Sequence, residues 1–176
     1  MPSRIFLRAF ENSDLTSLNE WRNSDEIFSE TGGNKFFISS EYDKKWLEDK
    51  IFNNEKNIYL AICKQDSKTI IGYLSINNID YRNSTANWGV CIGETTEWGK
   101  GYGTEALILM CDYVFNELGL NCFWSYWLTT NIASIKVAEK VGLTRWSDWS
   151  IAWQSAGRTP EPWIGPDILE VIDSFA

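Results

Sequence analysis

Three glycines alternate with other residues in the segment W-G-K-G-Y-G-T-E-A, which runs from Trp98 to Ala106. Glycine costs about 0.5 to 1 kcal/mol wherever regular structure must be held, so this spacing indicates a backbone that another group approaches closely. Good helix formers follow the last glycine, which places the glycine amides just ahead of a predicted helix. Unpaired N–H groups and the helix dipole favour an anion there, and a pyrophosphate is one such anion.

Two nucleotide-binding motifs come close to this segment. The phosphate-binding loop G-x-x-x-x-G-K-[ST] places its glycines five positions apart, whereas Gly93 and Gly99 are six apart and Gly101 stands where a hydroxyl should bind Mg²⁺. The dinucleotide fingerprint G-x-G-x-x-[GA] does match from Gly101, but two threonines stand where a ribose-binding carboxylate is expected. A turn that contacts nothing would need only one or two glycines, so a pyrophosphate of another kind is the favoured ligand.

Apolar periodicity predicts the elements that must position this loop. Helices are predicted at 12–27, 40–51, 104–118 and 131–140, and strands at 58–63, 70–79, 87–93 and 120–128. Ser40, with Asp43 three residues later, is the expected cap of the second helix. The first three strands should be antiparallel, whereas the strand, helix, strand unit forces its strands to be parallel. The pattern therefore predicts a mixed sheet in an α+β protein, with a last strand at 167–173.

Composition limits the class of protein. A length of 176 residues with 44% hydrophobic content suits one domain, expected to span residues 1–176. The net charge of −8 argues against nucleic acid as a partner, and no apolar run suits a signal peptide or a membrane span, so a cytoplasmic protein is expected. The four dispersed cysteines are expected to be reduced core residues, with no metal site. The absence of histidine excludes Ser-His-Asp and Cys-His systems.

The glycine segment, extended to E-W-G-K-G-Y-G-T-E-A-L, and the downstream N-I-A-S-I-K-V-A-E-K-V-G-L resemble the GNAT family of acetyl-CoA-dependent N-acetyltransferases. Within that family the chain looks like the RimJ/RimL branch, and the likeness covers Ile5 to Leu143, including W-R-N at residues 21–23. The resemblance implies the GNAT fold: a mixed, mostly antiparallel sheet with a splayed parallel pair of central strands and about four flanking helices. It also implies acetyl-CoA as cosubstrate.

The resemblance carries over residues for binding the cosubstrate. The family motif that binds the pyrophosphate corresponds here to Trp98, Gly99, Lys100, Gly101, Tyr102, Gly103 and Thr104. The pantetheine is expected to pair with the strand backbone at 89–93, where a backbone N–H of Val90, Cys91 or Ile92 would stabilise the oxyanion. Asn131 can cap the following helix and, in the family, also contacts the coenzyme.

Acetyl transfer to an amine needs a base and an acid. An aliphatic amine is neutral in only about one molecule in 10³ at pH 7, so its proton must be removed. Glu94, at the end of the third antiparallel strand, is the expected base, with Glu97 and Asp80 as alternatives and a solvated loop residue as the competing interpretation. Many family members carry a tyrosine acid at the position of Ala138; here Ser134, one turn earlier, is the candidate, although it could simply pack against the coenzyme.

The acceptor is left open by the sequence. Candidate acceptor-binding residues are Trp21, Arg22, Asn23 and Glu30, although Trp21, like Trp46, is more typical of a core residue. A protein N-terminus, a nucleotide-linked amino sugar, and a polyamine or aminoglycoside all suit the pattern, and a monomer or homodimer is expected. A non-catalytic acetyl-CoA-binding or interaction module is the alternative, because the usual tyrosine is missing and the region after residue 145 departs from the family.

Overall fold

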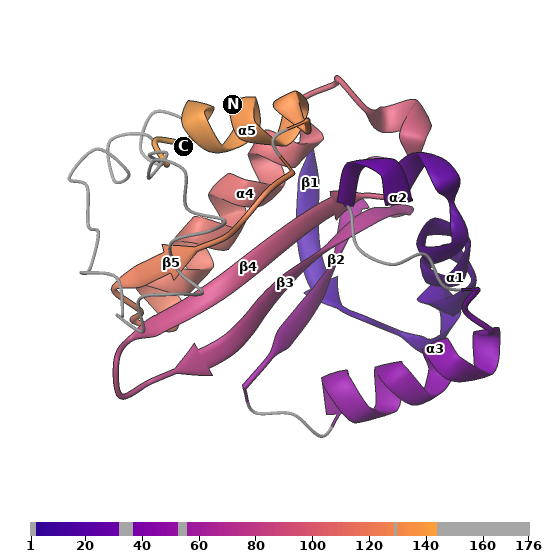
Figure 1. Cartoon of the computed structure of the whole chain (residues 1–176), viewed down its shortest axis with the longest axis horizontal. Coiled ribbons are helices and arrows are strands. Elements are labelled where there is room, and N and C mark those ends of the chain that lie inside the picture. Colours follow the sequence, from indigo (N-terminus) through magenta and orange to yellow (C-terminus); the bar gives the residue numbers. More distant parts are fainter. Residues whose placement is uncertain (1–2, 32–36, 53–55, 129, 144–176) are drawn as a thin grey trace.

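Five strands form one sheet in the order in which they follow along the chain (Figure 1). The computed structural model describes residues 3–31, 37–52, 56–128 and 130–143. The strands are β1 (Ile5–Ala9), β2 (Ile58–Lys64), β3 (Ile70–Asp80), β4 (Thr85–Ile92) and β5 (Cys122–Trp124). Neighbours from β1 to β4 are antiparallel, and β4 pairs with β5 in parallel. The predicted mixed sheet with one parallel pair is therefore confirmed.

The helices form two groups, with α1 to α3 in one and α4 with α5 in the other (Figure 1). They are α1 (Leu15–Asn23), α2 (Asp25–Thr31), α3 (Ser40–Leu47), α4 (Tyr102–Asp112) and α5 (Ile132–Lys140). Short 3-10 turns, η1 (Asn12–Asp14) and η3 (Thr95–Glu97), precede α1 and the glycine loop. Two π-helical turns, η2 (Glu48–Phe52) and η4 (Tyr113–Glu117), extend α3 and α4.

The end of β4 lies between the two groups of helices. A Cβ at Gly103 of α4 would lie 3.9 Å from Ile92, whereas one at Gly93 would overlap the indole of Trp21 on α1. Because successive residues of a strand point to opposite faces, α4 covers one face there and α1 covers the other. The core between the sheet and α4 includes fully buried Ile62 and Leu74. A site at the end of β4 can thus receive groups from both layers.

Two details of the predicted helices are wrong. The helix expected over 12–27 is broken at Ser24, whose ψ of 128° is extended, so that α1 and α2 are separate. The cap of α3 is Ser39, whose hydroxyl accepts a hydrogen bond from the N–H of Tyr42 at 3.1 Å, and not Ser40. The described residues therefore hold five α-helices rather than about four.

The strands differ from the prediction at both edges of the sheet. The strand expected over 120–128 pairs with β4 only at Cys122–Trp124, and β1 was not predicted because five residues give a short pattern. The strand expected at 167–173 lies outside the described residues. The four cysteines are free, as expected; three of them are core residues, whereas Cys91 is half-buried.

The β3–β4 pair allows a test of how tightly the end of the sheet is packed. A Cβ at Gly72 would overlap the carbonyl oxygen of Cys91, which is backbone and cannot rotate away. Overpacking costs about 1 to 3 kcal/mol, and about 1 kcal/mol shifts the melting temperature of a chain of this size by roughly 2 to 4 °C, so Gly72→Ala is expected to lower the melting temperature by roughly 2 to 12 °C. Thermal unfolding followed by circular dichroism measures this.

Gly103→Ala is the matched control, because its Cβ would make ordinary contacts at 3.9 Å and alanine favours a helix. It should melt at or above the wild-type temperature. Equal melting temperatures for Gly72→Ala and the wild type would contradict the packing described for β3 and β4.

Candidate active site

β4 and β5 separate after three paired residues. Their pairing runs from Thr85 opposite Cys122 to Asn87 opposite Trp124, and no further pair joins them in the described part of the chain. Beyond this point the hydroxyl of Ser125 donates to the carbonyl oxygen of Trp88 at 2.6 Å. A side chain thus replaces a strand partner. Beyond it β4 and β5 leave an opening between them, and the backbone of the last residues of β4 faces this opening.

The direction of the β4 amides follows from three hydrogen bonds. The carbonyl oxygens of Ser84, Trp88 and Ile92 accept bonds from the backbone of β5, from Ser125 and from the indole of Trp98. Because the N–H and C=O of one strand residue point to the same side and alternate along the strand, the amide of Val90 also faces the opening. The amide of Cys91 points the other way, toward β3.

The glycine loop follows η3 after the end of β4 and leads into α4. Gly99 and Gly101 have φ values of 73° and 89°, in the left-handed region where other residues are strained, and Gly101 is the N-cap of α4. The N–H groups of Thr104 and Glu105 donate to the carbonyl of Gly101 at 3.1 and 3.2 Å. The earlier amides of the loop therefore lie at the positive end of the helix dipole, where an anion is favoured.

Arg4, just before β1, holds this loop from the other side. Its Nη2 donates to the carbonyl of Lys100 at 2.9 Å, and its Nε donates to Glu105 of α4 at 2.6 Å. The guanidinium lies 4.6 Å from the ring centre of Tyr102. Arg4 was missed by the sequence analysis because it is 101 residues from its carboxylate partner, and no local spacing indicates such a pair.

Glu94 lies at the end of β4 and is half-buried. Its Oε1 accepts a hydrogen bond from the indole Nε1 of Trp21 at 3.1 Å. The ring of Trp21 stacks on Tyr73 of β3, with ring centres 6.4 Å apart. Glu94 therefore makes a defined contact with α1 at the end of β4.

The two alternative bases are in different surroundings. Glu97 accepts hydrogen bonds from Lys100 at 2.9 Å and Lys64 at 3.5 Å, and the Lys100 ammonium is the main cause that lowers its pKa. Asp80 accepts the backbone N–H groups of Arg82 and Asn83, and the bond from Asn83 is the main cause that lowers its pKa. Asp80 stands at the far end of β4, roughly 25 Å away along an eight-residue strand.

Asn131 and Ser134 lie at the start of α5. The side chain of Asn131 caps this helix by accepting the N–H of Ser134 at 2.9 Å, and its amide donates to the carbonyl of Glu30 on α2 at 2.8 Å. A Cβ at Gly103 would lie 3.9 Å from Val137, so α5 runs beside the first turn of α4. Ser134 is one turn before Val137 on the same helix face.

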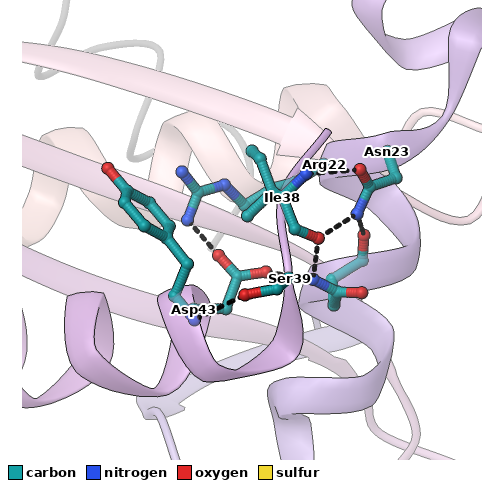
Figure 2. Close-up of polar contacts among 7 residues, drawn as sticks. Arg22, Asn23, Ile38, Ser39 and Asp43 are labelled. Atoms are coloured by element: carbon teal, nitrogen blue, oxygen red, sulfur yellow. Dashed lines mark hydrogen bonds and ion pairs between the residues drawn. The ribbon is translucent and has the colours of Figure 1, made fainter. Parts of the chain in front are cut away.

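The predicted acceptor residues on α1 make structural contacts (Figure 2). Arg22 forms an ion pair with Asp43, which is fully buried on α3. Asn23 binds Ile38 twice, accepting its N–H at 3.0 Å and donating to its carbonyl at 2.9 Å. These contacts hold α3 and the residues before it on α1. Glu30, by contrast, has an exposed side chain.

The cysteine nearest this site has a raised pKa, which makes it a poor nucleophile. Burial raises the pKa of the Cys91 thiol to about 12, and burial also raises the pKa of the neighbouring Tyr73 phenol. Since the thiolate is the reactive form, Cys91 stays an inert thiol at neutral pH. Within the described ranges, no group of His, Cys, Asp and Glu could hold a metal ion, and no helix is long and apolar enough to cross a membrane.

The chain is similar to known proteins over most of its length. Residues 4–144 match the acetyltransferase (GNAT) domain family. An uncharacterized N-acetyltransferase, p20 of Bacillus licheniformis, is 29% identical over 149 residues, which cover 81% of this chain and 83% of that protein. An N-acetyltransferase 9-like protein of Nematostella vectensis is 25% identical over 158 residues, which cover 83% and 77% of the two chains.

A solved structure has the same fold. The spermidine N-acetyltransferase of Vibrio cholerae, in complex with CoA and spermine, superposes with a TM-score of 0.71 at 21% identity, over 78% of this chain and 79% of that one. With the family match over most of the chain, these relatives define an acetyltransferase fold. The chain belongs to the GNAT family of acetyltransferases. It is an acetyl-CoA-dependent enzyme, with acetyl-CoA as cosubstrate.

The ion pair between α1 and α3 can be tested through stability. Asp43→Asn leaves the Arg22 guanidinium without its charged partner, and we expect a loss of about 2 kcal/mol because a hydrogen bond between charged groups is broken in a buried place. Chemical denaturation measures this loss. Asp49→Asn, at an exposed position on η2, is the control and should unfold as the wild type does. Equal unfolding of both variants would contradict a structural role for Asp43.

Proposed function

We propose that the chain acetylates a small primary amine by direct attack of the amine on acetyl-CoA in a ternary complex. The observation that carries this proposal is the opening between β4 and β5, which presents the Val90 amide beside the N-terminus of α4. A strand amide without a strand partner and a run of helix-start amides are suited to a thioester carbonyl and a pyrophosphate, respectively. Along the chain, the strand amide and the helix-start amides are separated only by the segment between β4 and α4.

The cosubstrate would be bound by the residues of the glycine loop and of β4. We assign the pyrophosphate to the amides from Gly99 to Gly103, with Trp98 and Thr104 at the two ends of that loop. Gly99 and Gly101 support this assignment, because their left-handed backbone turns successive amides in directions that other residues would hold only with strain. We propose further contacts with the coenzyme from Lys100, Tyr102, Ile92 and Asn131.

The oxyanion would be stabilised by the Val90 amide. A fixed backbone N–H that faces the opening costs no reorganisation when charge develops on the thioester oxygen. Ile92 has the same orientation, whereas the Cys91 amide points toward β3, so Val90 and Ile92 are favoured among the three predicted donors. Direct attack is favoured over an acyl-enzyme, because a pKa of about 12 for the Cys91 thiol leaves little thiolate at neutral pH.

Proton transfer would involve Glu94 and Ser134. Glu94 is favoured over Glu97 and Asp80 as the base, because Glu97 is paired with Lys100 and Lys64 and Asp80 lies at the far end of β4. Ser134 is the candidate acid for the departing thiolate, supported by its place one turn before Val137, the residue of α5 that lies near Gly103. A relay through water would let either residue act at a distance.

A polyamine is the acceptor that we would test first. The net charge of −8 attracts a cationic amine, and a structural neighbour is a spermidine N-acetyltransferase. Protein N-termini, as expected for the RimJ/RimL branch, and amino sugars are the further acceptors to include. A cytoplasmic location and a monomer or homodimer stay predictions; the spermidine enzyme has a dodecameric structure.

The glycine loop can be tested by placing a charge on it. Gly101→Asp puts a carboxylate at the N-cap of α4, and we expect acetyl-CoA binding to weaken at least 100-fold because the anion would meet a like charge. Calorimetry with acetyl-CoA measures this. Gly119→Asp is the matched control, because Gly119 has a φ of 64° and lies beyond the other end of α4. Unchanged affinity in Gly101→Asp would contradict the loop assignment.

The base can be tested by removing its charge. Glu94→Gln keeps the shape of the side chain but cannot accept the amine proton, so kcat is expected to fall about 10²- to 10⁴-fold with little change in KM for acetyl-CoA. Release of the CoA thiol over a panel of polyamines, amino sugars and peptides measures the rate. Tight acetyl-CoA binding by the wild type without turnover of any amine would contradict the proposed transfer.

A further inference from the structure

The indole of Trp21 connects two distant parts of the chain at the candidate site. Its Nε1 donates to Oε1 of Glu94 at 3.1 Å, across 73 residues of sequence. Trp21 is only 4% exposed, at the end of α1, whereas Glu94 follows β4. The hydrogen bond therefore fixes a loop carboxylate to a buried ring.

The ring itself is held in one place by the sheet. It lies against Gly93, where a Cβ would overlap three of its atoms, so only glycine leaves room for it. It also stacks on Tyr73 with an angle of 19° between the rings. Tyr73 stands opposite Cys91 in the β3–β4 pairing. The position of the indole N–H is thus set by β3 and β4, the strands that also carry the Val90 amide.

An indole N–H suits this role chemically. It is a donor only, and it neither takes up nor releases a proton near neutral pH. It can therefore hold one carboxylate oxygen without competing for the proton that a base must accept, and the second oxygen stays available. A long glutamate side chain that is held in one orientation also loses less freedom when it engages the amine.

We propose that Trp21 is a positioning residue for Glu94, and that it acts by orienting this carboxylate rather than by contacting the acceptor. This inference rests on the proposed function, in which Glu94 is the base. The proposal also explains the glycine at position 93, because any side chain there would overlap the Trp21 ring. Trp21 then has both predicted roles, because its ring packs in the core and its N–H binds Glu94 at the site.

The contact can be tested apart from activity by observing the indole N–H groups by NMR. The chain has ten tryptophans, and Trp21→Phe identifies the signal of Trp21 by removing it. Glu94→Ala should shift that signal, whereas Glu97→Ala, at the neighbouring carboxylate held by Lys100, should not. A Trp21 signal that stays in place in Glu94→Ala would overturn the proposal, whatever the enzyme acetylates.

The positioning role is tested by a double-mutant cycle. Trp21→Phe keeps a ring on Gly93 but removes the N–H, so kcat should fall about tenfold while KM for acetyl-CoA stays near the wild-type value. In the Glu94→Gln background the same change should have no further effect, because the carboxylate on which it acts is gone. Trp46→Phe is the control and should keep the wild-type kcat. The ring of Trp46, on α3, packs edge-on against Tyr59 of β2.

The outcomes separate this inference from the proposed function. A tenfold loss in both backgrounds would overturn the positioning role, since Trp21 would then act independently of Glu94. A normal kcat in Trp21→Phe together with an inactive Glu94→Gln would overturn it as well, and would leave the base in place. A fully active Glu94→Gln would overturn the base itself, and the positioning role with it.

Discussion

The separation of β4 from β5 is the constraint on which the rest of the structure depends. Parallel strands need a crossover, and here α4 is that crossover, so the chain passes from the end of β4 through η3 and the glycine loop into its N-terminus. The strand amides at the opening and the amides that begin the helix therefore come together in one place. If the pairing continued past Trp124, the strand amides would be bonded to β5, and only the helix start would be left for a ligand.

The two groups of helices give this opening its two sides. α4 and α5 pack on one face of the sheet, with Asn131 capping α5 and binding α2 across the end of β4. α1 packs on the other face through Trp21, and α3 is held to α1 by Arg22 and Asn23. Three consecutive residues of α1 thus bind three different segments: the loop after β4, the buried carboxylate of α3, and the backbone at Ile38.

Local patterns in the sequence were enough to predict most of the sheet and the glycine loop. The loop could be predicted because three closely spaced glycines indicate an unusual backbone, and α4 could be predicted because its apolar spacing is regular over three turns. The break at Ser24 was not predicted, because neighbouring residues on both sides of it favour helix. The cap at Ser39 was misplaced by one residue, since two adjacent serines offer the same hydroxyl.

The contacts that define the site beyond the loop are long-range and carry no local pattern. Arg4 meets Lys100 and Glu105, and Trp21 meets Glu94, across roughly half of the chain in each case. The short strand β1 is similarly set by its partner β2 rather than by its own five residues. The segment W-R-N was predicted to bind the acceptor. Only the fold shows that Arg22 and Asn23 instead hold α3 and the residues before it.

Hydrogen exchange resolved at single amides, with and without acetyl-CoA, tests the central claim most directly. The account predicts that acetyl-CoA slows exchange at Val90, at Ile92 and across the loop from Gly99 to Gly103, because these N–H groups would become hydrogen-bonded to the ligand. The amide of Cys91, already directed toward β3, should change less. Unchanged exchange at Val90 and the glycine loop in the presence of saturating acetyl-CoA would contradict the account.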